Sequence, residues 1–395
     1  MSAAREVVVV SAVRTAIGTF GGTLKDTPPT VLAATVVREA VKRAGVEAAT
    51  LGHLGVVRVV NTEPRDGYVA RLAAIDGGLD LHTPCLTVNR LCGSGLQAII
   101  SAAQHILLGD TDVALAGGAE NMSRGPFNIP GARFGLRMGD SQVVDMMVGA
   151  LTDPFNRYHM GMTAENVADK FSITREMQDQ LAYDSHQRAA KAIAEGRFDA
   201  QITPIVLKGK KGDTEFKVDE HVRADATLDK MRGMKPVFKK DGTVTAGNAS
   251  GINDGAAALV LMDAAAAEKK GLKPMARLVG YAHAGVEPEL MGIGPIPATQ
   301  RVLARTGIKA DQLDVIEANE AFAAQALAVA KGLDLDPARL NVNGSGISLG
   351  HPIGATGAII TTKAIYELQR SGGRYALVTM CIGGGQGIAA IFERL

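Results

Sequence analysis

The sequence repeats one pattern of apolar runs, helical stretches and glycines, and this repetition constrains the fold more than any other feature. The helical pattern at 41–46 reaches a glycine and leads into an apolar run, and the pattern at 302–308 does the same. Short Val, Ile and Leu runs that alternate with longer helical patterns are typical of parallel or mixed α/β architecture. We therefore predict an α/β fold with duplicated α/β halves, although unrelated α/β layers can share such patterns.

Two further segments correspond in the same order. Residues 87–89 lead to Cys92 and a helical pattern, while residues 341–343 lead to His351 and a second helical pattern. A duplicated unit would bring corresponding turns together across a pseudo-twofold axis. The sequence therefore predicts that Cys92 and His351 lie close together in space although they are far apart along the chain.

The region between the two halves differs in composition. Residues 122–249 have no regular βα alternation and carry Arg-, Gly-, Pro- and Met-rich stretches, a helical pattern at 174–195 and a basic cluster at 208–211. Long ordered loops are often functional. We predict an inserted loop domain over these residues, an N-terminal half made of 1–121 and 250–271, and a C-terminal half over 272–395.

Composition excludes several classes of protein. A formal net charge of +1 gives no strong field for nucleic acid or an anionic membrane, and the absence of tryptophan argues against base-stacking surfaces. No signal region precedes the apolar run at 7–10, and no run of 18 uncharged apolar residues is present. Three cysteines without a Cys-x-x-Cys pair fit a reducing compartment. We expect a cytoplasmic protein with no membrane span and no nucleic-acid partner.

Three reactive side chains stand in glycine-rich turns: Cys92, His351 and Cys381. Cys92 follows a strand-like run and precedes a helix, so the helix dipole is expected to favour its thiolate. Lowering the thiol pKa by about two units raises the rate of nucleophilic attack only about threefold, since the nucleophilicity of the thiolate falls as its fraction rises. Orientation and oxyanion stabilisation must therefore supply most of the rate. One imidazole and two thiols make covalent acyl transfer the leading hypothesis, while Cys85, among apolar neighbours, is expected to be an inert core thiol.

Each local context also permits a structural interpretation. Cys92 and His351 could be a buried thiol and an ordinary surface imidazole, and Asn319 could cap a helix rather than hold a water. The glycines at 383–387 could cradle a phosphate, but they lack the spacing and the Lys-Ser/Thr pair of a P-loop. No metal site is predicted. The remaining histidines with no comparable setting are expected to be structural or solvent-facing, namely His82, His105, His186, His221 and His283.

Taken together and in this order, the segments around Cys92, Asn319, His351 and Cys381 resemble those of the thiolases, enzymes that make or cleave 3-ketoacyl-CoA. The resemblance covers essentially the whole chain and includes the blocks at 13–15, 158–165, 247–255 and 291–295. The segments at 62–66 and 343–348 are more similar to the bacterial β-ketothiolase branch associated with polyhydroxyalkanoate synthesis. The resemblance implies a layered α-β-α-β-α arrangement of the two halves, with the inserted loop domain binding coenzyme A.

The resemblance also implies a role for each reactive residue. Cys92 attacks a thioester carbonyl and becomes acylated, and His351 accepts its proton. Cys381 removes an α-proton from a second acyl-CoA, and the carbanion attacks the acylated Cys92. The backbone amides of Cys92 and Gly383 are expected to form one oxyanion hole, and His351 with a water held by Asn319 to form the other.

Coenzyme A is implied as a substrate and product, with no tightly bound cofactor. The acyl-CoA substrates would occupy a slot in the inserted region, and the family is built as dimers or as homotetramers that are dimers of dimers. The segment 125–140 is a candidate assembly loop. The residues expected to contact the acyl-CoA are His159, Met160, Ser250, Ala321 and Phe322 along the pantetheine, Arg223 and Phe238 near the adenine, and Met291 at the acyl pocket.

Two positions depart from the family pattern. Val57-Arg58 stands where relatives carry Gly-Asn, and Asn121 stands where they carry serine. Three other functions remain as alternatives: a decarboxylating ketoacyl synthase on the same fold, a non-catalytic acyl-CoA or lipid carrier, and a nicotinamide oxidoreductase. The second thiol, Cys381, argues against the synthase. Retention of all three reactive side chains argues against the carrier, and the missing dinucleotide fingerprint argues against the oxidoreductase.

Overall fold

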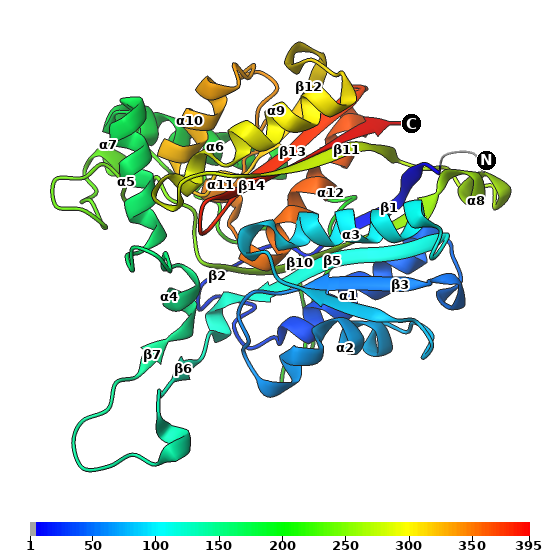
Figure 1. The fold of residues 1–395 in the computed structure, drawn as a ribbon, viewed down its shortest axis with the longest axis horizontal. Helices are drawn as coiled ribbons and strands as arrows, with labels where there is room; N and C mark the ends of the chain where they lie inside the picture. The colour runs from blue at the N-terminus through cyan, green and yellow to red at the C-terminus, as the bar shows by residue number, and fades with distance from the viewer. Residues whose placement is uncertain (1–4) are drawn as a thin grey trace.

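The computed structural model describes residues 5–395 and is built around a mixed sheet of ten strands (Figure 1). Nine of the strands follow one path across the sheet, and the short strand β2 (Gly18–Thr19) pairs with β10 beside that path. The path runs β12 (Leu313–Ala318), β13 (Tyr375–Ile382), β14 (Gln386–Arg394), β11 (Ala276–Gly285), β1 (Val7–Arg14), β10 (Asn253–Asp263), β5 (Val113–Asn121), β3 (His53–Val57) and β4 (Cys85–Val88).

The strand pairings confirm the duplication. In the first half β1 pairs antiparallel with β10, β10 antiparallel with β5, and β5 parallel with β3. The second half repeats this with β11, β14, β13 and β12 in the same senses. Even the parallel pairing of β3 with β4 has a counterpart, since Ile316 of β12 forms a parallel bridge with Leu340. The halves join where β1 meets β11.

The helices repeat as well. In the first half α1, α2 and α3 occupy the connections that α9, α10 and α12 occupy in the second. Gly45 and Gly307 end α1 and α9 in the left-handed conformation, with φ of 65° and 71°, which explains why the two glycines recur. The helix bounds are α1 (Pro29–Ala44), α2 (Val69–Asp76), α3 (Ser94–Leu108), α9 (Pro295–Thr306), α10 (Ala323–Gly332) and α12 (Ile353–Ser371), with the short helices α8 (Ala264–Lys269) and α11 (Gly346–Leu349).

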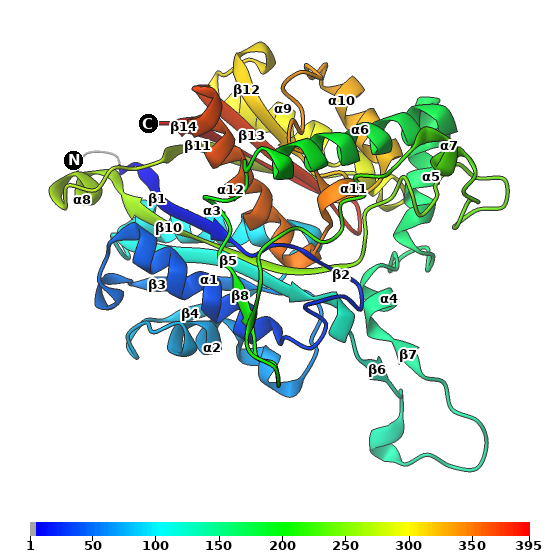
Figure 2. The ribbon, with the colours of Figure 1, turned by 180° about the vertical axis from the view of Figure 1, so that it is seen from behind.

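The elements form five layers. Figures 1 and 2 show α1 and α2 on the outer side of the first half and α9 on the outer side of the second. Helix α12 contacts strands of both halves and packs against α3, so these two helices form the central layer. The largest apolar cluster lies around α3 and α12, and separate clusters lie beneath α1 and beneath α9. This is the α-β-α-β-α arrangement that the resemblance implied.

Glycines let the two central helices touch through their backbones. A Cβ on Gly357 of α12 would lie 2.2 Å from the backbone nitrogen of Leu96, and one on Gly95 of α3 would lie 2.6 Å from that of Ala358. These glycines of the Cys92 and His351 segments therefore serve helix packing, not the approach of a ligand. Among residues 5–395, one window, Leu91–Leu108, could cross a membrane by length and composition, but most of it is buried in this central layer.

Residues 122–249 show no βα alternation. Helices α5 and α6 of this region cover one end of the second half, and the β6–β7 hairpin extends away from the body as an arm (Figure 1). Its elements are β6 (Phe127–Asn128), β7 (Val144–Asp145), α4 (Met146–Ala150), α5 (Met160–Phe171), α6 (Arg175–Ala194), β8 (Ile205–Leu207), β9 (Thr214–Phe216) and α7 (Leu228–Arg232).

Candidate active site

A cavity of about 440 Å³ lies where the two halves and the inserted region meet. It is within the size range of small-molecule sites. Cys92 enters it from the first half, and His351, Cys381 and Gly383 enter it from the second. All the residues expected to contact the acyl-CoA line it too: His159, Met160, Arg223, Phe238, Ser250, Met291, Ala321 and Phe322. Among the predicted catalytic and acyl-CoA-binding residues, Asn319 alone does not line the cavity.

Cys92 sits in a 3₁₀ turn, Leu91–Gly93, immediately before α3. Leu91 has a positive φ of 47°, a conformation that a bulky residue rarely adopts. Cys92 is half-buried, and desolvation raises the pKa of its thiol to about 11. Hydrogen bonds from the backbone of Gly383 and of Cys92 itself lower the pKa, but by less than desolvation raises it. The expectation that the helix dipole would favour the thiolate is therefore wrong for the free protein, since desolvation outweighs the nearby amides.

Cys381 and Gly383 lie on a tight hairpin. Strand β13 ends at Ile382 and pairs with Gln386 of β14, so residues 383–385 form the connection, and Gly384 and Gly385 have φ of 80° and 85°. Burial, and then the neighbouring Cys92, raise the pKa of the Cys381 thiol well above its usual range. Because a strand and not a helix follows the glycines, they do not form a phosphate loop at a helix N-terminus.

His351 is held on its Nδ1 side and open on its Nε2 side. Nδ1 lies 2.7 Å from Oγ1 of Thr356, and that hydroxyl lies 3.0 Å from the carbonyl of Pro352. We assign the imidazole proton to Nδ1, because Thr356 can then accept from Nδ1 and donate its own proton to Pro352. Nε2 is buried without a hydrogen-bond partner. Burial lowers the pKa of His351 to about 4, which keeps the imidazole neutral with a free lone pair on Nε2.

The backbone of His351 is also fixed. Its N–H donates to Oδ1 of Asn253 at 2.9 Å, and Asn253 in turn donates to the carbonyl of Gly18 on β2. Gly350 has a φ of 110°, and a Cβ there would lie 2.5 Å from the Asn253 side chain. Glycine at 350 is therefore required both by conformation and by space.

Asn319 does not cap a helix. The helix that follows, α10, begins at Ala323 with Phe322 at its N-cap position. The Asn319 side chain is buried, with Nδ2 at 3.4 Å from Nδ1 of His351 and with Oδ1 lacking a partner. An unsatisfied buried amide oxygen beside the His351 imidazole fits a group that holds a water molecule.

The slot that leads to the reactive groups is lined by aromatic and apolar side chains. His159 stacks on Phe238 with ring centroids 4.6 Å apart, and Phe238 meets Phe322 edge-on at 6.3 Å. Ser250 is tied to Ala321 by a backbone hydrogen bond of 2.9 Å. Arg223 lines both this cavity and an adjoining one of about 340 Å³. The slot thus combines a long apolar surface with a cationic side chain toward one end.

Sequence reasoning missed three side chains of the site. Thr356 and Asn253 orient His351, and His221, which the sequence had suggested was merely structural, lines the cavity. Thr356 lies five positions after His351 and on the next turn of the chain, which is the signal that could have identified it. His221 has no such signal, because only folding of the inserted region brings it to the cavity.

The two departures from the family pattern pack without conflict. Arg58 is buried, and its Nε donates to the carbonyl of Asp66 at 2.5 Å. Asn121 is buried too; its Nδ2 donates to the carbonyls of Leu24 and Thr27, and its Oδ1 accepts from the backbone of Arg124. Cys85 lies half-buried in β4, and burial raises the pKa of its thiol, as expected of a core cysteine. No group of three or more His, Cys, Asp or Glu side chains within 5–395 could hold a metal ion.

Comparison with known proteins agrees with this geometry. The family profile "Thiolase, N-terminal domain" matches residues 7–265, and "Thiolase, C-terminal domain" matches residues 272–394. The β-ketothiolase BktB of Cupriavidus necator is 66% identical over 99% of this chain and 100% of its own length. The acetyl-CoA acetyltransferase of Escherichia coli is 48% identical over 98% of this chain and 99% of its own length.

Solved structures share the fold along the whole chain. The acetyl-CoA acetyltransferase of Bacillus anthracis is 48% identical, with a TM-score of 0.98 and coverage of 100% of both chains. Human mitochondrial 3-ketoacyl-CoA thiolase in complex with CoA is 43% identical, with a TM-score of 0.96 and coverage of 99% of this chain and 98% of that one. From its sequence, its duplicated fold and its two-thiol cavity, the chain belongs to the thiolase family of acyltransferases.

Proposed function

We propose that this chain catalyses the reversible condensation of two acyl-CoA thioesters, acetyl-CoA with acetyl-CoA or another short acyl-CoA, to a 3-ketoacyl-CoA and free coenzyme A. The observation that carries this proposal is the convergence of Cys92, His351 and Cys381 on one largely apolar cavity. A ketoacyl synthase would need no second thiol there, and a carrier would need none of the three.

In the first half-reaction, the Cys92 sulfur attacks the thioester carbonyl while its proton passes to Nε2 of His351. A thiol whose pKa is about 11 is nucleophilic only with such a base, and the neutral imidazole with a free Nε2 supplies it. The backbone of Gly383 hydrogen-bonds the sulfur, which puts its N–H beside the carbonyl oxygen on which charge develops. The bond to the CoA sulfur then breaks, and Cys381 donates its proton to that leaving sulfur.

In the second half-reaction, the Cys381 thiolate takes an α-proton from the incoming acyl-CoA. The carbanion attacks the acyl carbon on Cys92, the bond to the Cys92 sulfur breaks, and the sulfur recovers its proton from His351. Before the sulfur recovers the proton, Nε2 of His351 still carries it. Nε2 can therefore donate a hydrogen bond to the enolate oxygen, together with a water held by Asn319. Nδ1 donates to Thr356 throughout, so no rearrangement of the ring is required.

The acyl-CoA arm would lie along His159, Met160, Ser250, Ala321 and Phe322, with the nucleotide toward Phe238 and Arg223 and the acyl group toward Met291. An apolar slot with few polar partners suits pantetheine, and methionine adapts its shape to the bound chain. Coenzyme A is then a substrate and product and not a resident cofactor.

The decisive experiment mixes pure protein with acetoacetyl-CoA and CoA and follows the absorbance of the enolate. We expect decay with the wild-type protein and near-complete loss of decay for Cys92→Ser, with the circular dichroism spectrum retained. Cys381→Gly should still form the acyl-enzyme but should not complete condensation. Wild-type protein that leaves the enolate unchanged would remove the proposal, and normal condensation by Cys381→Gly would remove the two-thiol scheme.

We also propose a homotetramer or dimer in the cytoplasm, with the arm around 125–140 as the assembly element. The arm exposes large apolar side chains to solvent, including Phe134 at 89% and Met138 at full exposure. Patches of this kind on a single chain mark protein–protein contact. Strand β4 is, in addition, an edge of the sheet with an open row of backbone groups.

A further inference from the structure

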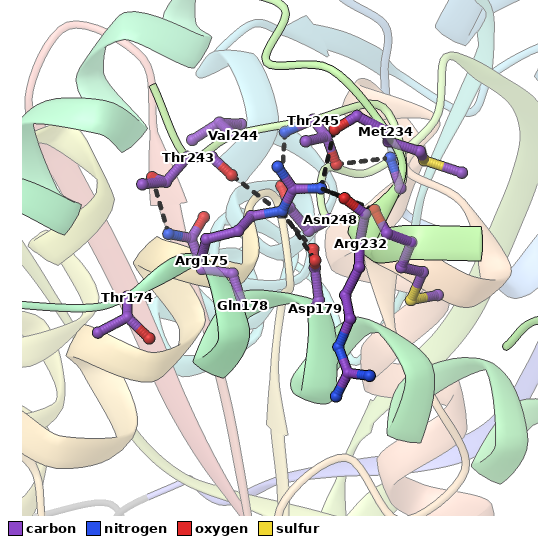
Figure 3. A network of polar contacts seen from close by, with 12 residues as sticks. Thr174, Arg175, Gln178, Asp179, Arg232, Met234, Thr243, Val244, Thr245 and Asn248 are labelled. Carbon is purple, nitrogen blue, oxygen red and sulfur yellow. Dashed lines mark hydrogen bonds and ion pairs between the residues drawn. The ribbon is translucent and has the colours of Figure 1, made fainter. Parts of the chain in front are cut away.

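One partly buried ion pair outside the cavity is hydrogen-bonded to chain segments that form the cavity walls. Arg175, the first residue of α6, pairs through Nε with Oδ2 of Asp179 at 2.8 Å, and the Asp179 side chain is almost completely buried. Neither residue lines either cavity. Figure 3 shows the guanidinium surrounded by the end of α7 and by residues 243–248.

The guanidinium first fixes the end of α7. Its Nη2 donates to the carbonyl of Met231 at 2.7 Å and to that of Met234 at 2.9 Å. Both methionines line the second cavity, and the chain that continues from them carries Val237 and Phe238 into the first. A planar guanidinium can satisfy a carboxylate and two carbonyls at once, which an ammonium group cannot do in the same geometry.

The carboxylate then fixes the opposite wall. Oδ1 of Asp179 accepts from Nδ2 of Asn248 at 2.9 Å, and the carbonyl of Asn248 accepts from the backbone of Ala323 at 2.9 Å. Asn248 also accepts from the backbone of Thr245, a cavity residue (Figure 3). Ala246 and Ala249, on either side of this contact, line both cavities, and Phe322 lies next to the bonded Ala323.

We infer that Arg175 and Asp179 are positioning residues for coenzyme A: the pair sets the width of the slot between residues 231–238 and residues 245–249. This inference rests on the proposed function, since it presumes that coenzyme A occupies the slot. Cys92, His351 and Cys381 come from the central layer and the β13–β14 hairpin, and none of these elements contacts the pair through the bonds described. Loss of the pair should therefore weaken coenzyme A binding while leaving the chemical groups in place.

The test measures binding and chemistry separately. Desulfo-CoA is titrated calorimetrically, and thiolysis of acetoacetyl-CoA is measured over a range of CoA concentrations up to saturation, which gives kcat and KM. The alkylation rate of Cys92 by iodoacetamide reports on the reactive thiol. For Arg175→Met we expect desulfo-CoA to bind about tenfold more weakly and KM for CoA to rise similarly, which is about 1.4 kcal/mol. We expect kcat and the alkylation rate to stay within about twofold of wild type. Arg175→Lys, which can keep the pair with Asp179 but not both carbonyls, should fall between.

Arg188 provides a matched control on the same helix. It donates to the carbonyl of Leu340 at 2.8 Å and lines neither cavity, so Arg188→Met should leave the Kd for desulfo-CoA within about twofold. If Arg175→Met fails to fold because it leaves a lone buried carboxylate, Arg175→Met/Asp179→Asn takes its place and is held to the same criteria.

Three results distinguish the possibilities. Unchanged desulfo-CoA binding in the folded Arg175 variant overturns the inference. So does a fall in kcat and alkylation rate as large as the loss of binding, because that pattern indicates general loosening. Wild-type protein that does not bind desulfo-CoA at all refutes instead the proposed function on which the inference rests.

Discussion

At the scale of the residue, the nucleophile and its base are both uncharged before substrate arrives. Burial raises the pKa of Cys92 to about 11 and lowers that of His351 to about 4, so a preformed thiolate–imidazolium pair is not favoured. In the proposed reaction, charge would then develop only when a thioester carbonyl is in place beside the backbone of Gly383.

This neutrality predicts the pH dependence of alkylation. A thiol with a pKa of about 11 is ionised to about one part in ten thousand at pH 7, and the fraction rises tenfold per pH unit until the pKa is approached. The rate of Cys92 alkylation by iodoacetamide should therefore rise with unit slope from pH 7 to beyond pH 9. Cys92→Ser gives the background from the other cysteines. A plateau below pH 8 would instead reveal an ion pair with His351.

Thr356 predicts a second residue-scale effect. Thr356→Val keeps the volume but removes the hydroxyl 2.7 Å from Nδ1, so the imidazole loses its fixed orientation and the hydrogen bond that supports it when protonated. We expect kcat to fall roughly 10- to 100-fold, less than the full contribution of general base catalysis because the imidazole itself remains, with KM little changed. Thr356→Ser, which restores the hydroxyl, should recover activity to within about threefold. Equal losses in both variants would contradict the hydroxyl's role.

At the scale of the element, the crossing of α3 and α12 connects packing to chemistry. Cys92 precedes α3 and His351 precedes α12, so the distance between these helices controls the distance between nucleophile and base. The backbone contact at Gly95 and Gly357 sets that distance without any side chain that could adjust. Small changes at the crossing should therefore affect activity as well as stability.

Gly357→Ala tests this crossing. The added methyl group would lie 2.2 Å from the Leu96 nitrogen, which is backbone and cannot move alone, so we expect a loss of about 1 to 3 kcal/mol and a lower activity. Gly149→Ala is the matched control, because a Cβ there meets nothing within 4 Å and α4 gains helix propensity. Its thermal midpoint should be unchanged or slightly higher. A Gly357 variant as stable as the control would contradict backbone contact at the crossing.

Sequence analysis predicted the local elements well and the tertiary roles of single residues less well. The recurrence of Gly45 and Gly307 at helix ends, and of turns before Cys92 and His351, was enough to predict the duplication, because periodicity and helix-ending residues are local signals. The thiol pKa was predicted in the wrong direction, since desolvation depends on what covers Cys92. Asn253 and His221 were missed because folding brings them to the site from other segments, whereas Thr356 was missed although its spacing from His351 is a local signal.

At the scale of the whole molecule, the arm predicts a change in assembly. Replacing residues 128–143 with a short Gly-Ser connection removes the exposed Ile129, Phe134, Leu136 and Met138 while leaving the cavity intact. We expect a smaller particle by light scattering coupled to size-exclusion chromatography, with activity per chain largely retained. An unchanged molar mass would show that other surfaces, such as the edge strand β4, are sufficient for assembly.

The order of strands also has a consequence for how the chain is made. Within the sheet β1 lies between β10 and β11, and β10 separates it from β5, yet β10 is synthesised roughly 240 residues after β1. At translation rates of 5–20 residues per second, the first strand waits about 10 to 50 s on the ribosome without a sheet partner. The four consecutive valines at its start lack their strand neighbours for that time, so nascent chains of this protein should depend on chaperones that shield apolar segments until β10 emerges.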